Sequence, residues 1–291
     1  MELVTKEIIV RDLRALGIVS GMRVIVHSSL KSFGQVEAGP KTIVDALMEV
    51  VTEEGILLFP SFNHATAFEL GAPGYYSSKE TRTIDGAIPD YFWRQPGVLR
   101  TIDPSHPFAA WGKQAREFLK DHHRNITMSA ESPLGRLWRS DGYALLLGVH
   151  YGPNTFKHVT EMTNNVPCLG ARTEAYLVKL PDGRTVLGRT WGWREKNCPI
   201  SEPGRHLQGE MERRGLHVKG NVAAANSILF KLDDCYKVLS EMLAKGFAGF
   251  PPCSACSIRP RHCAATVESD WDFEHNCLRP DSLAWTYEDG L

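Results

Sequence analysis

The sequence predicts an α/β protein with a largely parallel sheet that is covered on both faces. Three short apolar runs, each bounded by turn residues, have the length and composition of buried strands: residues 23–27, 56–60 and 144–149. Amphipathic helical patterns at residues 4–16 and 42–51 alternate with the first two runs. Since apolar strands that alternate with helices are typical of parallel sheets, we expect this architecture.

A polar or turn-forming loop follows each of the three predicted strands. Residues 27–29 (His-Ser-Ser) end the first strand, residues 61–63 (Ser-Phe-Asn) follow the second, and Gly152-Pro153 lies beyond the third. In parallel sheets, ligand sites form at the carboxyl ends of the strands. We therefore expect the functional site where these three loops meet.

Shorter elements are expected elsewhere. Asp182-Gly183 separates two alternating runs at residues 175–180 and 184–187, which predicts a β-hairpin. Residues 65–87 show no periodicity and predict a long surface loop of the kind that serves as a substrate lid. The other predicted elements are a strand at 108–111 and helices at 88–93, 113–119, 134–139, 204–214 and 233–245.

Length and composition predict one large domain with an unusual tail. The 291 residues suffice for one large domain or two small ones. We expect residues 1–250 to form a single domain and residues 251–291, rich in Cys and Trp, to form an extension packed on it.

Charge and hydropathy exclude several classes of protein. The formal net charge is −1 and no basic block occurs, so nucleic-acid binding is not expected. No run of eighteen apolar residues occurs, so no membrane span is expected. The first residues lack the pattern of a signal peptide, which predicts a cytoplasmic protein. Seven cysteines, an odd number, argue for reduced thiols or a metal site rather than a disulfide framework.

The third strand leads into a candidate catalytic motif. Asn154 or Thr155 can cap a helix that begins after the strand, and His158 and Glu161 then share one helix face. A carboxylate beside an imidazole can fix its tautomer and raise its basicity, as a general base requires. His-x-x-Glu pairs are also common on solvated helix faces, so the spacing alone leaves both readings open.

A series of motifs in chain order resembles one known family, the aminoglycoside 3-N-acetyltransferases. The resemblance covers residues 5 to about 245. Its motifs are Val26-His27-Ser28-Ser29-Leu30, Gly39-x-x-Thr42-x-x-Asp45-Ala46-Leu47, Gly55-x-Leu57-x-x-Pro60-x-Phe62, Gly97-Val98-Leu99-Arg100-Thr101, Pro107-x-x-Ala110-Trp111-Gly112, Ser132-Pro133-Leu134-Gly135-x-Leu137, Leu145-Leu146-Leu147-Gly148-Val149 and Asn154-Thr155-x-x-His158-x-x-Glu161.

The resemblance implies a fold and a reaction. The fold is a three-layer α/β/α arrangement distinct from the common acetyl-CoA N-acetyltransferase fold, and the donor and acceptor are acetyl-CoA and an amine. His158 matches the family's catalytic histidine, and Glu161 would orient it. The hydroxyl of Thr155, or the free N–H groups of the helix start, would stabilise the oxyanion. His27 also matches a site position, although a buried histidine satisfied by the backbone is an equal alternative.

The donor and acceptor sites are expected in separate sets of loops. Backbone groups of Ser28, Ser29 and Leu30 would contact the pantetheine arm, and the full expected coenzyme A set adds Ser32, Phe33, Thr101 and Phe108. The expected acceptor residues are Asn63, Asp103, His106 and Glu202. The family's Arg-Ser-x-His-Pro motif is replaced at residues 100–107 by a sequence with a shifted His-Pro pair, and net acidity is slight. Both departures put a polycationic aminoglycoside acceptor in question.

The cysteine-rich tail is a candidate zinc site. Cys253-x-x-Cys256 has the spacing of half a zinc site, and His262 and Cys263 follow within reach as further ligands. The overall spacing fits no common zinc finger, so a tail without metal is the alternative. Cys168 or Cys198 as an acyl-carrying nucleophile finds little support, because neither has an identifiable histidine partner.

Three functions compete at this point. The first is an acetyl-CoA-dependent 3-N-acetyltransferase of aminoglycoside-type antibiotics, with an antibiotic-resistance role. The second is a biosynthetic N-acyltransferase of the same family that acts on another amine, such as an amino sugar, an amino-phosphonate or a peptide-like intermediate. The third is a binding protein that has lost turnover. The expected partners are a small-molecule amine and coenzyme A, and a homodimer is considered as the assembly.

Overall fold

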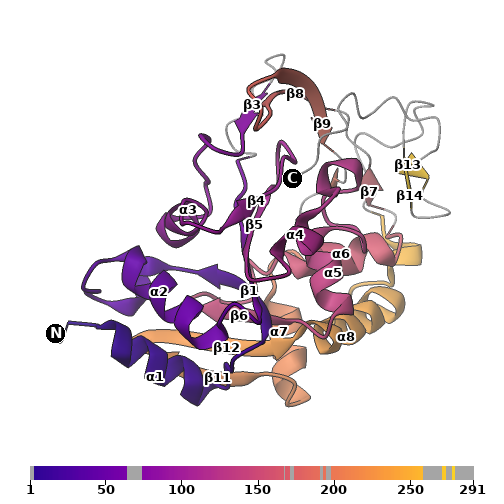
Figure 1. Cartoon of the computed structure of the whole chain (residues 1–291). Coiled ribbons are helices and arrows are strands. Elements are labelled where there is room, and N and C mark those ends of the chain that lie inside the picture. Colours follow the sequence, from indigo (N-terminus) through magenta and orange to yellow (C-terminus); the bar gives the residue numbers. More distant parts are fainter. Residues whose placement is uncertain are drawn as a thin grey trace.

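A seven-stranded sheet forms the centre of the molecule (Figure 1). The computed structural model describes residues 3–63, 74–166, 168–170, 174–190, 193–194, 198–257, 271–272 and 277–278. The strand order is β11-β12-β6-β1-β2-β5-β4. These strands are β1 (Arg23–Ser28), β2 (Ile56–Pro60), β4 (Leu99–Arg100), β5 (Phe108–Trp111), β6 (Tyr143–Leu147), β11 (Val218–Val222) and β12 (Ala225–Lys231).

The mixed character of this sheet confirms the α/β class but corrects its strand directions. Only β6, β1 and β2 pair in parallel, while the four other neighbouring pairs are antiparallel. The expectation of a mostly parallel sheet was therefore wrong for the outer strands. For β11 and β12 the reason is their connection, because a two-residue turn can join only antiparallel neighbours.

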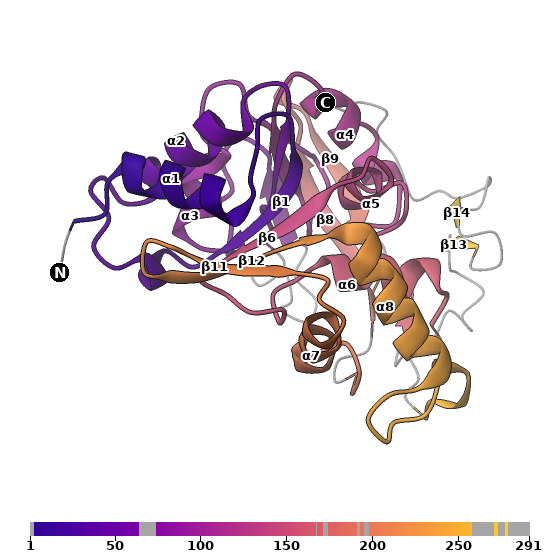
Figure 2. The ribbon, with the colours of Figure 1, turned by 90° about the horizontal axis from the view of Figure 1, so that it is seen from below.

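Helices cover both faces of the sheet, so the three-layer α/β/α arrangement is confirmed (Figure 2). Side chains of β1 alternate between the layers, because Val24 and Val26 join one apolar cluster and Ile25 joins the other. The first cluster includes α1 (Lys6–Leu16), α2 (Pro40–Val51) and α3 (Ala87–Phe92). The second includes α4 (Ala115–Leu119), α5 (Pro133–Arg139), α6 (Phe156–Thr163), α7 (Arg205–Arg213) and α8 (Leu232–Lys245).

The seven helices predicted by residue range are all present, with ends within two residues of the prediction. Their sequence signals were strong because apolar residues recur at helical spacing and cap residues or glycines mark the ends. In α1, for example, the buried residues are Ile9, Val10, Leu13 and Leu16, and Gly17 ends the helix with a positive φ of 108°. None of the described helices is both long and apolar enough to cross a membrane.

A second, three-stranded sheet lies beside the central one and has the order β3-β8-β9. The predicted hairpin is confirmed as β8 (Glu174–Lys179) and β9 (Thr185–Thr190). The expectation of a surface loop at residues 65–87 was wrong for β3 (Gly74–Ser77), which pairs in parallel with β8, while residues 64–73 lie outside the described part. Tyr76 is buried in this sheet and donates its hydroxyl proton to Thr101 O at 2.6 Å, so the sheet packs over the start of the 101–108 loop.

The remaining short elements lie at the edges of the main layers. They are β7 (Leu169–Gly170) paired with β10 (Trp193–Arg194), β13 (Trp271–Asp272) paired with β14 (Cys277–Leu278), and the 3₁₀ turns η1 (Leu30–Phe33), η3 (His122–Arg124) and η4 (Cys253–Ala255).

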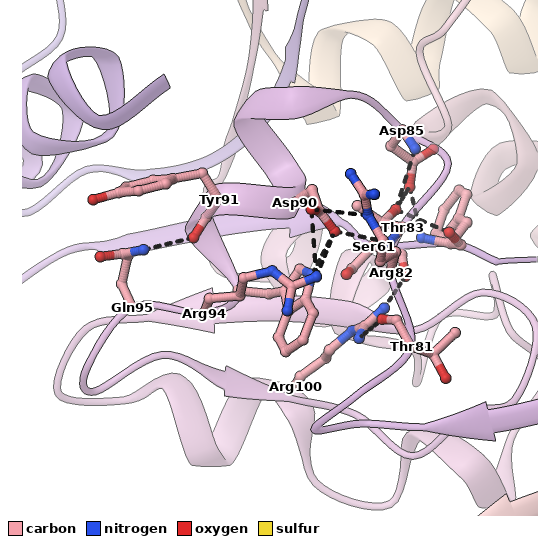
Figure 3. A network of polar contacts seen from close by, with 12 residues as sticks. Ser61, Thr81, Arg82, Thr83, Asp85, Asp90, Tyr91, Arg94, Gln95 and Arg100 are labelled. Carbon is pink, nitrogen blue, oxygen red and sulfur yellow. Dashed lines mark hydrogen bonds and ion pairs between the residues drawn. The ribbon is translucent and has the colours of Figure 1, made fainter. Parts of the chain in front are cut away.

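A buried arginine ties the segment after β3 to the end of β2 (Figure 3). Arg100 donates to Thr81 O at 2.5 Å and to Ser61 O at 2.8 Å, and its guanidinium lies 4.5 Å from the ring centroid of Trp93. Nearby, Asp85 accepts from the backbone N–H of Phe62 at 2.6 Å, and burial raises the pKa of Asp85 to about 6. These contacts fix the polar loop that follows β2.

Candidate active site

The parallel pairing of β1 with β6 brings the first and third predicted loops together. His27 lies beside Leu146 in the register, and the backbone N–H of Ser29 donates to Leu147 O at 2.9 Å. The chain then leaves β6 and enters α6, and Thr155 Oγ1 comes within 3.4 Å of His27 Nε2. This contact joins the end of β1 to the segment after the neighbouring strand β6, through residues that lie 128 positions apart in the chain.

The start of α6 shows which of the two expected caps is used. Asn154 is fully buried, and its Oδ1 accepts from the backbone N–H of Phe156 at 3.2 Å. Thr155 makes no side-chain capping bond, because its hydroxyl faces His27 instead. Asn154 is therefore the residue that caps the helix, and the hydroxyl of Thr155 is directed toward the site.

His158 and Glu161 form the pair that their spacing predicts. His158 Nδ1 lies 2.8 Å from Glu161 Oε2, while Ser201 Oγ donates to Glu161 Oε1. The side chain of Glu161 is 1% exposed and that of His158 is 29% exposed. A buried carboxylate with a bond to each oxygen thus holds an imidazole that reaches solvent, which is the arrangement of an oriented general base.

His27 is buried and neutral. Burial, with a smaller contribution from the positive charge of Lys157, lowers its pKa to about 3. Since a neutral imidazole has one donor and one acceptor nitrogen, Nε2 can either accept from Thr155 or donate to it, depending on the tautomer. His27 is therefore a hydrogen-bonding partner of Thr155 and not a cation at neutral pH.

With this geometry in place, three comparisons identify the family. The sequence model of the family described as aminoglycoside 3-N-acetyltransferase matches residues 25–244. The chain is also similar to the SPbeta prophage-derived aminoglycoside N(3′)-acetyltransferase-like protein YokD of Bacillus subtilis, at 37% identity over 79% of this chain and 89% of that protein. The chain belongs to the aminoglycoside 3-N-acetyltransferase family. It is an aminoglycoside 3-N-acetyltransferase-like enzyme.

Other members of the aminoglycoside 3-N-acetyltransferase family extend the likeness. Aminoglycoside N(3)-acetyltransferase VIII of Streptomyces fradiae is 29% identical over 84% of this chain and 94% of that protein. A crystal structure of an AAC(3)-IVa mutant in complex with apramycin superposes with a TM-score of 0.69 at 26% identity, over 88% of this chain and 98% of that one. The structure titled AAC-IIIb binary with CoASH has the same fold, with a TM-score of 0.75 at 24% identity over 86% and 100% of the two chains.

The candidate donor residues of this acetyltransferase line the end of β1 and the turn η1. Ser32 Oγ donates to Gly148 O at 2.9 Å, and Phe33 is fully buried in the core. A Cβ atom on Gly148 would lie only 2.3 Å from Ser32 Cβ, so the side chain of Ser32 packs directly on the backbone of Gly148. Among Ser28, Ser29 and Leu30, the backbone N–H of Ser29 is used by Leu147 O. Residues 28–33 are thus held rigidly against the loop that leads to α6.

Thr101 and Phe108, also expected in the donor site, are buried and bonded to each other. Phe108 N–H donates to Thr101 Oγ1 at 3.0 Å, and this oxygen lies 3.1 Å from His122 Nδ1. His122 Nε2 lies 2.9 Å from Thr127 O, so Nε2 carries the proton and Nδ1 accepts from the hydroxyl. Burial lowers the pKa of His122 to about 3, which keeps this chain of bonds neutral. The two residues support the 101–108 loop with their side-chain and backbone polar groups.

Three of the four expected acceptor residues lie where the loop after β2 meets the 101–108 loop. Asp103 is fully buried and accepts at Oδ1 from the N–H groups of Ser105 and His106, at 3.1 and 2.8 Å. Asn63 N–H donates to Ser105 O at 3.1 Å, and the His106 ring packs edge-on against Phe62 with centroids 4.9 Å apart. Burial raises the pKa of Asp103 to about 6. Asn63, Asp103 and His106 therefore belong to one cluster.

The fourth expected acceptor residue, Glu202, contacts the helix that carries His158. Its backbone oxygen accepts from Lys157 Nζ at 3.0 Å, and its carboxylate Oε2 is 4.0 Å from the same nitrogen. Glu202 directly follows Ser201, which binds Glu161. The structure thus connects Glu202 to the His158–Glu161 pair through its neighbour Ser201.

Two residues of this site were missed by the sequence analysis. Ser201 binds Glu161 across 40 positions in the chain and lies in an irregular segment, so no short motif marks it. Lys157 is 4% exposed on a short helix that also buries Phe156 and Val159. A lysine between two core residues on a predicted helix was the available signal.

The tail residues are only partly described. Cys253 and Cys256 are partly exposed cysteines outside any disulfide, and His262 and Cys263 lie outside the described residues. Burial raises the pKa of Cys253 to about 11, which keeps it a thiol. Within the described part of the chain, no three His, Cys, Asp or Glu side chains are grouped so that they could hold a metal ion. Cys168 and Cys198 are buried thiols of the core.

Proposed function

We propose that the protein transfers an acetyl group from acetyl-CoA to the 3-amino group of an aminoglycoside-type acceptor, with His158 as the general base. The observation that carries this proposal is the chain of contacts from Ser201 through Glu161 to the partly exposed ring of His158. Membership of the aminoglycoside 3-N-acetyltransferase family supports the reaction class and the donor.

The chemistry follows from the orientation of the imidazole. Glu161 fixes Nδ1 as the protonated nitrogen, so Nε2 has the lone pair that removes a proton from the attacking amine. The amine nitrogen then forms a bond to the thioester carbonyl carbon, and the carbon–sulfur bond breaks. The proton held by His158 passes to the leaving thiolate, which departs as coenzyme A. A buried carboxylate beside the ring stabilises the transient imidazolium.

Thr155 is proposed to stabilise the oxyanion of the tetrahedral intermediate. Its hydroxyl must then donate to the oxyanion, and His27 must donate its Nε2 proton to Thr155 Oγ1. The low pKa of His27 supports this arrangement, because a neutral ring can adopt the required tautomer. Residues 28–33, with Thr101 and Phe108, are proposed to form the coenzyme A side of the site.

The identity of the acceptor has a second candidate, another amine such as an amino sugar, an amino-phosphonate or a peptide-like intermediate. This second candidate is favoured because Asp103 and Glu202, the expected acidic residues of the acceptor site, already have partners within the protein. Asp103 uses Oδ1 to hold its own loop, and the carboxylate of Glu202 lies near the ammonium of Lys157. Fewer carboxylate oxygens are then available to bind the ammonium groups of a polycationic aminoglycoside. Against this, the AAC(3)-IVa mutant and AAC-VIa have solved structures in complex with apramycin and sisomicin.

One experiment separates these candidates from a binding protein without turnover. Release of coenzyme A is measured with acetyl-CoA and a panel of amines that includes kanamycin-type aminoglycosides, amino sugars and amino-phosphonates. Acetylation of the aminoglycosides supports the first candidate, and turnover restricted to the other amines supports the second. An absence of thiol release with every amine, while coenzyme A still binds, would contradict both. A rise in aminoglycoside tolerance on expression in a susceptible host would test the resistance role.

We further propose that residues 251–291 form an extension packed on the acetyltransferase domain and hold a structural zinc through Cys253, Cys256, His262 and Cys263. The packing of Cys253 against the core near α8 supports the first part. Cys-x-x-Cys spacing supports the second. Elemental analysis of the purified protein should show one zinc per chain. Purified protein that is fully active and contains no metal would contradict the proposed zinc site.

A further inference from the structure

Lys157 is a buried cation whose contacts lead to the catalytic pair. It is the second residue of α6 and its side chain is 5% exposed. Lysine side chains are almost never this buried unless their charge is compensated, because desolvation of an ammonium is costly. The contacts of the ammonium group should therefore explain why a lysine stands at this position.

The ammonium joins two loops that are far apart in the chain. Lys157 Nζ donates to Gly152 O at 3.0 Å and to Glu202 O at 3.0 Å. Gly152 lies in the loop between β6 and α6, and Glu202 lies in the segment that leads to α7. Charge-assisted hydrogen bonds to backbone oxygens fix the backbone itself, whatever side chains the loops carry.

The loop held at Glu202 also presents Ser201 to the active site. Ser201 is fully buried and its hydroxyl donates to Glu161 Oε1. The N–H of Glu202 donates to Cys198 O and that of Gly204 to Ser201 O, both at 3.1 Å, so residues 198–204 form a compact turn around this serine. Displacement of Glu202 O from Lys157 would move Ser201 away from Glu161.

We propose that Lys157 is a positioning residue of the acyl-transfer site, which holds the 198–204 turn against α6 so that Ser201 keeps Glu161 aligned with His158. The inference rests on the proposed function of His158 as the base. Lys157 acts through the backbone contact at Glu202 and does not touch the reacting atoms.

The charge of Lys157 has only a secondary effect on the pKa of His27. Its positive charge lowers the pKa of His27, but burial is the larger cause. A neutral replacement at position 157 should therefore leave His27 uncharged at neutral pH. Loss of activity in such a variant would come from the released loop.

The test compares Lys157→Met, which keeps the length and removes the donors, with Lys157→Arg, which keeps charge and donors. We expect Lys157→Met to lower kcat about tenfold with little change in KM for acetyl-CoA, and Lys157→Arg to restore most of kcat. The control is Lys113→Met, because Lys113 is an exposed partner of Glu54 and lies away from these loops. If Lys157→Met does not fold, Lys157→Leu also removes the donors, and the same loss of kcat is expected.

A double-mutant cycle with Ser201→Ala tests the route of the effect. If Lys157 acts through Ser201, the activity of the double variant should equal that of the less active single variant. Multiplied losses would overturn the proposal, and so would a kcat equal to that of the Lys113→Met control.

Hydrogen exchange gives a readout that does not depend on activity. The amide protons of Glu202 and Gly204 should exchange at least tenfold faster in Lys157→Met than in wild type, and at the wild-type rate in the Lys113→Met control. Unchanged exchange would overturn the loop contact even if the enzyme is active. Faster exchange in a protein that shows no turnover with any amine would contradict the proposed function alone.

Discussion

The two halves of the candidate site are built in different ways. At the His158 half, the proposed base and its carboxylate come from one turn of α6 and are joined by a single side-chain bond of 2.8 Å. At the Asp103 half, the loop after β2 and the 101–108 loop are joined largely through backbone groups, such as Ser61 N–H with Pro107 O at 2.9 Å. The first half can be disabled by one side chain, whereas the second depends on the shape of two loops.

The largest effect is expected at the His158 half. His158→Ala removes the proposed base and should lower kcat by about 10³-fold, while binding of coenzyme A and the melting temperature stay near wild-type values. Steady-state kinetics with calorimetric binding of coenzyme A measures both. A variant that keeps most of the wild-type rate would remove His158 from the mechanism.

The Arg100 network should affect folding more than chemistry. Arg100→Met leaves Thr81 O and Ser61 O without their buried donor and should lower the free energy of unfolding by roughly 3 kcal/mol. Chemical denaturation measures this change. Arg94→Met is the matched control, because Arg94 lies over the same Trp93 ring but is more exposed, and it should change stability by less than about 1 kcal/mol. Equal losses in the two variants would mean that burial of Arg100 contributes nothing.

Thr155 distinguishes an oxyanion donor from a helix cap. Thr155→Val keeps the shape and removes the hydroxyl, and kcat should fall about 10²-fold while stability changes little, because Asn154 provides the cap. Thr155→Ser should retain most of the activity. If Thr155→Val loses stability and keeps kcat, the hydroxyl has a structural role only.

The smallest effect is expected at Asp103 and depends on pH. Because burial raises its pKa to about 6, native Asp103 holds a proton at pH values where the unfolded chain has lost it. The contribution of Asp103 to the free energy of unfolding therefore falls as pH rises from about 4 to 6 and stays lower above that range. Asp103→Asn keeps an acceptor oxygen and avoids this loss, so at pH 8 it should gain roughly 2 kcal/mol, and near pH 4 almost nothing.

Melting temperatures of wild type and Asp103→Asn across this pH range provide the measurement. A destabilised variant at pH 8 would contradict the raised pKa. The same variant also tests the acceptor assignment, since a higher KM for cationic amines with unchanged KM for acetyl-CoA is expected if Asp103 contacts the acceptor.

The sequence predicted those features that depend on neighbours in the chain. The helices and the core strands follow from the spacing of apolar residues. The pair His158–Glu161 follows from a three-residue spacing on a helix. The family resemblance added the reaction, and the match to residues 25–244 bears it out.

Features without a clear local signal were missed. The β11–β12 hairpin has Ala223 at a positive φ of 50°, where Gly or Asn would have given a turn signal, so neither strand was predicted. β3 pairs with a strand about 100 positions later, and nothing local in Gly74–Ser77 predicts this. The contacts of Ser201 with Glu161 and of Lys157 with Glu202 join residues about 40 positions apart, which a local sequence pattern cannot predict.

The contact of Ser32 with Gly148 has a practical consequence for redesign. Ser32 belongs to the loop proposed to bind coenzyme A, and Gly148 lies between β6 and the helix that carries His158. Any side chain added at position 148 would therefore push these two segments apart. An engineer who wants room for a larger acyl group should leave this junction unchanged and vary the rim instead, since enlargement at the junction would displace the imidazole along with the pocket wall.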